Sequence, residues 1–237
     1  MVVGEDAKLS AYFFTSFNEA QRILESANKS TAKSLKEIAN EENSKRRAKN
    51  EKSMTKAEVE DIIGINPWKD ARVSTVPLDF AVGLANRGKI KGAYFRIAPA
   101  EDDVQDALTI DKTDDLPEGK VPLFYFEDFE VDLEKGEELW SGNPDTKKKI
   151  PLYFSKGQLI QEWKKRNSKA GKDDIPEVKV TELFSVLSQF VVALESDDDL
   201  EKLVLVAPPE SEGKAKACVK KGGKETPFKL GERIVVL

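Results

Sequence analysis

Short apolar runs alternate along the chain with segments in which apolar residues recur every three or four positions. Each run has the length and the aromatic or β-branched composition of a strand, and several lead directly into a segment with helical spacing. Four blocks of this kind in the first half return in the same order in the second. The first-half blocks are residues 11–16, 73–78, 93–98 and 121–127, and their counterparts are residues 151–156, 178–181, 202–207 and 226–232.

The ends of the blocks also correspond. The third block closes with Ala98-Pro99-Ala100-Glu101 in the first half and with Ala207-Pro208-Pro209-Glu210 in the second. The fourth opens with Val121-Pro122-Leu123 and with Thr226-Pro227-Phe228. Matches in a fixed order indicate an internal duplication, whereas generic alternation of strands and helices is the alternative.

The pattern therefore predicts an α+β fold of two pseudo-symmetric βα-rich repeats, with mixed or antiparallel sheets and helices packed on them. We expect the first repeat at residues 9–133, a linker at 134–149 and the second repeat at 150–237. The long interruption of the first repeat, residues 31–72, is strongly charged. It predicts one or two exposed helices around a mobile connector, the last of which ends at Asn66-Pro67.

Polar residues predict where helices begin. A capping box, in which a Ser or Thr side chain and a Glu or Gln three residues later bond each other's amides, is expected at Ser16–Glu19, Thr55–Glu58 and Ser155–Gln158. Thr181 is the expected N-cap of the helix that follows residues 178–181. Gly88 is expected to end the helix that begins at Leu78. Gly222-Gly223 is expected to form a hairpin turn.

Composition narrows the class of protein. The chain has 237 residues, 39% hydrophobic and 34% charged, and a net charge of −5, which argues against a nucleic-acid binder. It contains one cysteine and no histidine, so an intramolecular disulfide and His-based catalysis are excluded. No apolar run has the length of a membrane span, and the N-terminus has neither a signal-peptide nor a transit-peptide pattern. We expect either an untargeted chain or a mature form that lacks its transit peptide.

Residues that might carry chemistry are better explained as surface features. The acidic runs 101–103 and 197–199 lack the spacing of a calcium loop and suit helix starts and turns. The basic run 45–49 is balanced by flanking glutamates, and residues 220–224 lack the strand–loop–helix context of a phosphate loop. Cys218 has no histidine to pair with. We therefore expect no catalytic, metal-binding or cofactor-binding residues, and a protein that is not an enzyme.

Aromatic residues in the strands are the remaining distinctive feature. Because successive strand residues point to opposite faces, adjacent aromatics cannot all face the same way. Two interpretations stay open: helices cover both faces of the sheets and the aromatics form the core, or one face is open and offers an apolar groove to an unfolded segment or a partner. The candidate contact residues for such a groove are Tyr12, Phe14, Tyr94, Phe124, Phe126 and Tyr153.

Several of these strands resemble a known family. The pair formed by residues 121–126 (VPLFYF) and 150–159 (IPLYFSKGQL) is similar to a strand and a strand–helix junction of the twenty-two-kilodalton subunit family of the translocon at the inner envelope of chloroplasts. Residues 92–99 (GAYFRIAP) and 204–209 (VLVAPP) resemble two further strand segments of that family. The likeness covers most of residues 12–209, and the charged insertion departs from it.

The resemblance implies a pseudo-twofold α+β fold with apolar pockets and no cofactor. It also implies a plastid protein of the intermembrane space or the envelope, held at the membrane only through protein partners. We expect chaperone-like binding of preproteins in transit, with preproteins or other subunits of a membrane complex as partners and no nucleic acid. The alternative is a structural accessory subunit of a plastid membrane complex.

Overall fold

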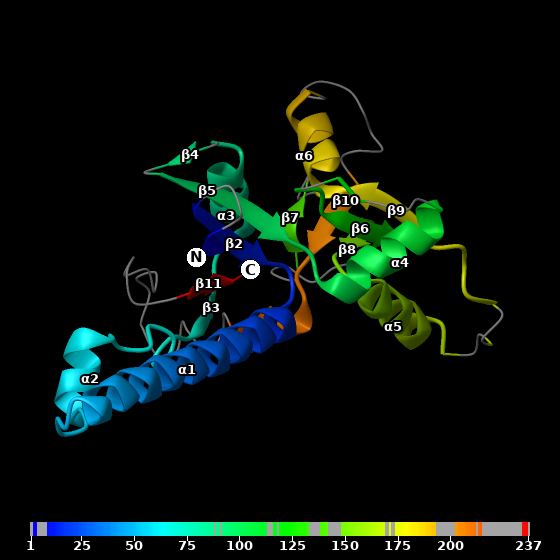
Figure 1. The fold of residues 1–237 in the computed structure, drawn as a ribbon. Coiled ribbons are helices and arrows are strands. Elements are labelled where there is room, and N and C mark those ends of the chain that lie inside the picture. Colours follow the sequence, from blue (N-terminus) through cyan, green and yellow to red (C-terminus); the bar gives the residue numbers. More distant parts are fainter. Residues whose placement is uncertain are drawn as a thin grey trace. The chain divides into compact units, whose positions relative to one another are not determined.

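The computed structural model describes residues 2–3, 9–87, 89–90, 92–112, 116–117, 119–132, 138–141, 148–168, 171, 174–192, 202–211, 213–214 and 234–236. It has the predicted α+β architecture (Figure 1). The chain divides into two compact units: the larger comprises Met1–Phe17, Ser74–Pro227 and Val235–Leu237, and the smaller Asn18–Val73 and Phe228–Ile234. This division does not follow the two halves of the sequence, and the predicted repeats stay a prediction.

The first sheet of the larger unit has the strand order β1-β2-β5-β4. Its strands are β1 (Val2–Val3), β2 (Leu9–Phe14), β5 (Ala93–Ala98) and β4 (Lys89–Ile90). The two long strands, β2 and β5, are parallel and in register along their whole length, and the two short strands pair antiparallel with them. Helix α3 (Leu78–Ala85) packs against β5. The strand predicted at residues 93–98 is therefore present as β5.

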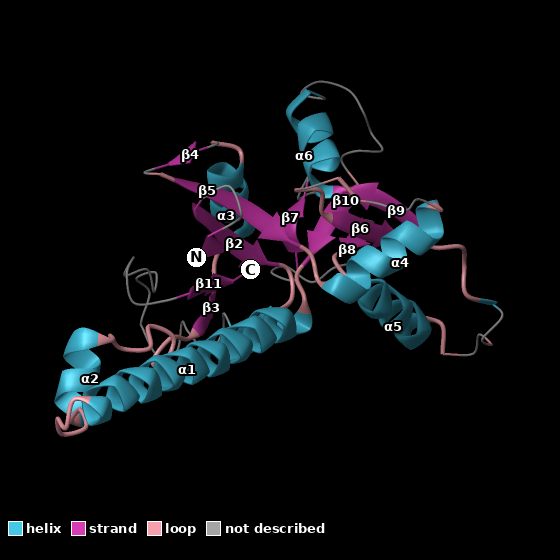
Figure 2. Cartoon of the chain, in the orientation of Figure 1, coloured by secondary structure: helices cyan, strands magenta, loops and turns pink. Residues whose placement is uncertain are grey.

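The second sheet has the order β7-β10-β8-β6-β9 (Figure 2). Its strands are β7 (Glu138–Ser141), β10 (Leu203–Val206), β8 (Ile150–Tyr153), β6 (Pro122–Tyr125) and β9 (Lys179–Glu182). β8 and β10 are parallel, and the other pairs are antiparallel. β6, from the first half of the sequence, lies between β8 and β9 from the second. β7 lies inside the predicted linker 134–149, whose strand the pattern did not indicate.

Helices α4 (Glu101–Asp111) and α5 (Lys156–Arg166) lie on one side of the second sheet (Figure 1). Phe124 of β6 is paired with Tyr153 of β8, and both rings point toward these helices into a core with Leu159 and Trp163 of α5. Residues of the opposite face of the sheet are buried as well, with exposed fractions of 0–1%: Leu123, Leu152 and Leu205. Both faces are therefore covered, and this sheet follows the core interpretation of the aromatic strands.

Helix α6 (Leu183–Val192) continues directly from β9, and its N-cap is Glu182 rather than the predicted Thr181. The Glu182 carboxylate accepts hydrogen bonds from the backbone N–H groups of Phe184 and Ser185 at 3.1 and 2.9 Å. Thr181 instead lies within β9, opposite Leu123 of β6. The strand extends further than its sequence pattern indicates, and the cap moves with it.

Helix α1 (Phe17–Ala48) is a single helix of 32 residues that continues without a break into the predicted insertion at 31–72. The segment holds no Gly or Pro that would interrupt it. Pairs one turn apart line its surface, including Arg22 with Glu19 at 2.6 Å and Lys45 with Glu41 at 2.9 Å. The charged insertion therefore continues a helix that has already begun.

The segment from Met54 to Asn66, which contains helix α2 (Lys56–Ile62), returns along α1. The predicted capping box is confirmed: the Thr55 N–H donates to the Glu58 carboxylate at 2.7 Å and the Glu58 N–H donates to the Thr55 hydroxyl at 3.3 Å. The Met54 N–H donates to Asn43 Oδ1 at 2.7 Å, and Asn66 Nδ2 donates to Asn28 Oδ1 at 2.7 Å. These contacts fix the direction of the return segment.

Helix α2 ends at Ile62, before the predicted end at Asn66-Pro67. Gly64 has φ +105°, a conformation that favours glycine and stops the helix.

Two further strands, β3 (Val73–Thr75) and β11 (Ile234–Val236), pair to form a two-stranded sheet. The predictions at Gly88, 197–199, Cys218, 220–224 and 226–232 lie outside the described residues.

Candidate functional site

The first sheet has one face covered by α3 and one face with half-buried aromatics. Phe13 of β2 and Ile97 of β5 are neighbours in register and are 3% and 2% exposed. Phe80 of α3 lies edge-on to the Phe13 ring, with centroids 6.4 Å apart. Phe13 and Ile97 on this α3-facing side therefore belong to the core, whereas Phe80 is 40% exposed.

Tyr12, Phe14 and Tyr94 point to the opposite face, because they alternate with Phe13 and with Phe95 along their strands. All three are half-buried. The Tyr12 and Phe14 rings are 6.3 Å apart and tilted by 34°, as expected for residues two apart on one strand face. We call these three residues the aromatic face.

The aromatic face contains half of the six predicted contact residues. The other three, Phe124, Phe126 and Tyr153, are 0–2% exposed and lie in the core beneath α4 and α5. A client segment has no access to these three side chains in this conformation, so the prediction that they are contact residues is wrong for this conformation. Alternation in the sequence shows which residues share a face of a strand, but it does not show which of the two faces the rest of the protein covers.

The second component of the candidate site is the part of β5 that β4 leaves unpaired. β4 pairs with β5 only at Ala93 and Tyr94, and no further strand of the described chain lies beside residues 95–98 on that side. We call residues 95–98 the β5 edge. Edge strands present unpaired backbone N–H and C=O groups to which an extended peptide can add as a further strand.

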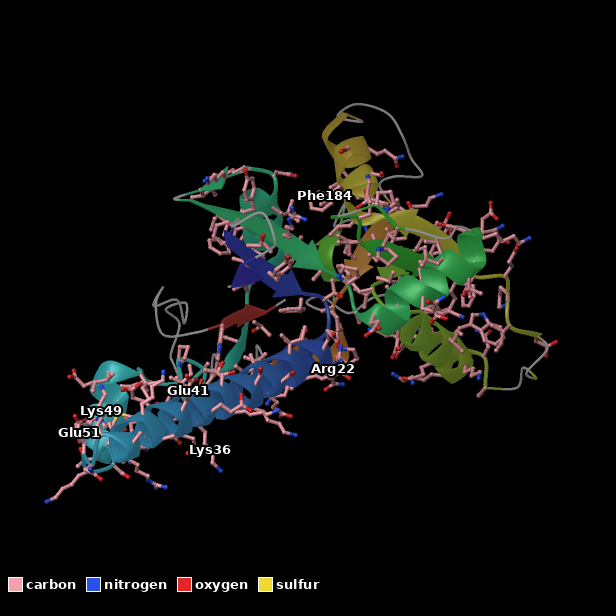
Figure 3. The ribbon with its side chains drawn as sticks, viewed as in Figure 1. Arg22, Lys36, Glu41, Lys49, Glu51 and Phe184 are labelled. Atoms are coloured by element: carbon pink, nitrogen blue, oxygen red, sulfur yellow. The ribbon has the colours of Figure 1, made fainter. Side chains whose placement is uncertain are left out.

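A cavity of about 290 Å³ follows the β5 edge. Its lining is residues Ala85, Asn86, Tyr94, Phe95, Arg96, Ile97, Gly119 and Phe184. Figure 3 shows Phe184 at the beginning of α6. Arg96 is charged and Asn86 is polar, but the other side chains of this lining are mostly apolar, so the cavity suits an apolar side chain. The sequence pattern predicted neither the cavity nor the contribution of Phe184.

Glu182 holds the segment that carries Phe184. Besides the α6 amides, its carboxylate accepts from the Val121 N–H at 3.3 Å and from Lys120 Nζ at 3.1 Å. Burial alone would raise the pKa of Glu182, but the hydrogen bonds from Phe184, Lys120, Ser185 and Val121 outweigh it and lower the pKa. The charged carboxylate therefore fixes the start of α6 to the start of β6.

A buried carboxyl lies elsewhere, at the start of α4, where the sequence predicts a helix beginning for the acidic run 101–103. Asp103 is 8% exposed, and burial raises its pKa to about 6, in spite of a hydrogen bond with Ser155. Because Ser155 is engaged with Asp103 it makes no side-chain cap for α5, and Gln158 Nε2 donates to the Ala207 carbonyl at 3.1 Å. The predicted capping box at Ser155–Gln158 is therefore wrong.

Other charged side chains line the surfaces of α1 and α2. Figure 3 shows Lys36 and Glu41 projecting from α1 on different sides of the helix. In the basic run 45–49, Lys45 pairs with Glu41 and Arg46 with Glu58, which confirms a balanced, solvated helix surface. Among the described residues no group of three or more His, Cys, Asp or Glu side chains converges as a metal site. Nor does any described helix have the length and apolarity needed to cross a membrane.

Comparisons with known proteins add two similar solved structures. No family model and no curated protein matches the chain. Tic22 from Plasmodium falciparum superposes with a TM-score of 0.49 at 15% identity, over 94% of this chain and 89% of that one. Anabaena Tic22 (protein transport) superposes with a TM-score of 0.46 at 16% identity, over 92% and 84%.

Proposed function

We propose that the protein is a non-enzymatic import factor of plastids that binds extended apolar segments of preproteins along the β5 edge. The observation that carries this proposal is the coincidence of three features in one sheet: the unpaired edge at residues 95–98, the cavity beside it and the aromatic face. The motif resemblance supplies the biological context. We place the protein in the intermembrane space or at the envelope, attached to the membrane only through protein partners.

The binding mode follows from strand geometry. A segment added to the β5 edge places alternate side chains on the two faces of the sheet, near Tyr94 on one face and near Phe95 on the other. Full burial of one apolar side chain contributes about 1.5–3 kcal/mol, and association itself opposes binding by a comparable or larger amount. Affinity is therefore weak and reversible, which suits a factor that releases its client without ATP.

An aggregation assay tests the proposal. The purified protein is expected to suppress aggregation of an unfolded client protein in proportion to its concentration. Tyr12→Asp with Phe14→Asp should remove the suppression, because each change places a charge on the aromatic face. The matched control is Ile62→Asp with Ile65→Asp, two isoleucines that are 58% and 67% exposed in the smaller unit. That variant should retain full suppression.

Circular dichroism must show that the aromatic-face variant is folded. If the Asp pair unfolds the chain, Tyr12→Ser with Tyr94→Ser tests the same face with a smaller perturbation. Absence of suppression by the unaltered protein at every ratio, or equal loss in the control, would refute the proposed function.

A second candidate function is a structural accessory subunit of a plastid membrane complex. It is favoured by apolar residues that stand exposed in the smaller unit: Ile38 is 50%, Ile62 58% and Ile65 67% exposed. Isoleucines that are exposed on α1, on α2 and just after α2 suit a permanent protein interface. Co-purification in fixed stoichiometry, abolished by Ile62→Asp with Ile65→Asp, would favour the subunit over a transient chaperone.

A further inference from the structure

A second cavity, of about 590 Å³, lies in the second sheet's part of the larger unit. Three segments line it: the turn after β6 (126–132), the end of α5 (163–167) and the approach to β9 (176–179). Its volume falls within the range of roughly 300–1,000 Å³ that is usual for ligand pockets. We call it the acidic cavity, for the reason that follows.

Carboxylates dominate its rim. Five acidic residues line the cavity against two basic ones: Glu127, Asp128, Glu130, Asp132 and Glu177 against Arg166 and Lys179. Two of the acids already have partners, since Glu130 lies 3.3 Å from Lys148 and Glu177 lies 2.9 Å from Lys179. Within the described part of the chain neither Asp128 nor Asp132 forms an ion pair, so the rim carries a surplus of negative charge.

Aromatic rings form the floor. Phe126 is in edge-to-face contact with Phe129 at 6.0 Å and with Trp163 at 6.3 Å, which fixes all three rings. Phe129 and Trp163 are each 8% exposed. A carboxylate rim above aromatic rings is suited to long cationic side chains, whose aliphatic stems contact rings while the charged heads reach carboxylates.

The acids do not converge on one point. Among the described residues they form no group that could hold a metal ion. Separated carboxylates instead suit a ligand with several spaced positive charges. Lys179, on the rim, is also the first residue of β9, and β9 is an edge strand of its sheet. A peptide backbone can therefore follow the edge while its side chains enter the cavity.

We propose that the acidic cavity binds an extended peptide segment bearing spaced lysine or arginine residues. The site is separate from the β5 edge and does not depend on the proposed chaperone activity. A protein with both sites would contact a basic and an apolar stretch of one partner independently.

Fluorescence anisotropy with a labelled Arg–Leu repeat peptide tests the site in the full chain. Asp128→Asn with Asp132→Asn should weaken binding about three- to tenfold, the effect of removing two exposed ion pairs with the peptide. The matched control is Glu60→Gln with Asp61→Asn, which removes the same charge from the exposed surface of α2. It should change the affinity less than about twofold, because it alters only the long-range, screened field.

Two further probes decide between ligands. A Glu–Leu repeat peptide should not bind, and spermine, a polycation without a backbone or apolar side chains, should bind more weakly than the Arg–Leu peptide. Backbone NMR shifts on addition of the Arg–Leu peptide should concentrate at residues 126–132 and 176–179. Equal loss of affinity in both charge variants, spermine binding as tight as the peptide, or shifts confined to other residues would each overturn the proposal.

Discussion

The Lys156 ammonium of α5 lies 2.7 Å from Asp106 Oδ1 of α4, and so joins two helices that are fifty positions apart in the sequence. One turn earlier on α4, Asp103 shares a hydrogen bond with Ser155, the residue before Lys156. Two acids of one helix thus meet the beginning of the other. The contact between α4 and α5, the two helices that cover the core of the second sheet, is therefore polar at this point. Because Asp103 takes part in it, the contact is sensitive to pH.

Replacing Asp103 by Asn should stabilise the protein at neutral pH. The folded-state pKa of about 6 is above the ordinary value of 3.8, so the native state binds a proton more tightly than the unfolded chain. Stability therefore falls as pH rises from about 4 to about 6 and stays reduced above that. Asp103→Asn should add about 1–2 kcal/mol at pH 7.5 and flatten this dependence.

Urea unfolding of Asp103→Asn and the unaltered protein, at several pH values between 4 and 8, measures the effect. The nearby charges of Asp106 and Asp102 also raise the pKa of Asp103. The control is Asp61→Asn, which removes a charge from the exposed surface of α2. A variant that is less stable than the unaltered protein at pH 7.5 would contradict the assignment of a destabilising buried charge.

Glu182→Ala should destabilise the larger unit by about 2 kcal/mol. The change leaves the N–H groups of Val121, Phe184 and Ser185 without their carboxylate acceptor, and loss of a helix cap alone costs about 1 kcal/mol. Since the pKa of Glu182 is lowered, this stabilisation is present above the ordinary value of 4.5 and disappears as pH falls through the folded pKa. Thermal unfolding at pH 7 checks the loss.

Glu177→Gln provides the comparison, because the pair that Glu177 forms with Lys179 is exposed. It should change stability by less than about 0.5 kcal/mol. Equal effects of the two substitutions would mean that Glu182 is an ordinary surface acid.

Thr55→Ala should loosen α2 without unfolding the larger unit. The capping box contributes about 1 kcal/mol, and α2 is only 7 residues long, so its loss should appear locally. Amide hydrogen exchange at residues 56–62 should accelerate several-fold. Ser53→Ala, on the exposed residue two positions earlier, should leave the exchange rates unchanged. Unaltered exchange in Thr55→Ala would show that the box does not stabilise the helix.

Phe126→Ala should destabilise the protein more than Tyr12→Ala, because Phe126 is a core residue and Tyr12 lies on the aromatic face. Phe126 is 1% exposed and contacts two other rings, so truncation should cost about 3–5 kcal/mol. Tyr12 is half-buried on the aromatic face and should cost less than half as much. Chemical denaturation measures both. A Tyr12→Ala variant as unstable as Phe126→Ala would place Tyr12 in the core and remove it from the candidate site.

Local features of the fold could be predicted from the sequence, because they depend on residues close in the chain. The strand at 93–98 and the capping box at Thr55–Glu58 belong to this class. The position of β6 between β8 and β9 could not be, since strand order is decided by long-range packing. Ser155 illustrates the same limit: its sequence suits a cap, but Asp103, distant in sequence, takes its hydroxyl.

The candidate site was predictable only in part. Alternation shows that Tyr12 and Phe14 share a face opposite Phe13, but which face α3 covers depends on tertiary packing. The β5 edge exists because β4 stops after two residues, at Lys89–Ile90, and no local pattern marks how far a partner strand extends. Composition could have suggested the acidic cavity, since four of its five acids fall within residues 127–132.

Hydrogen exchange at the β5 edge tests the central proposal most directly. An extended apolar client peptide that adds to this edge must pair with backbone groups of residues 95–98, which have no strand partner on that side in the described chain. With saturating peptide, the amides in this stretch that do not face β2 should slow by at least about tenfold, while those of α2 stay unchanged. Unchanged exchange at residues 95–98, in the presence of a peptide shown to bind, would contradict the account.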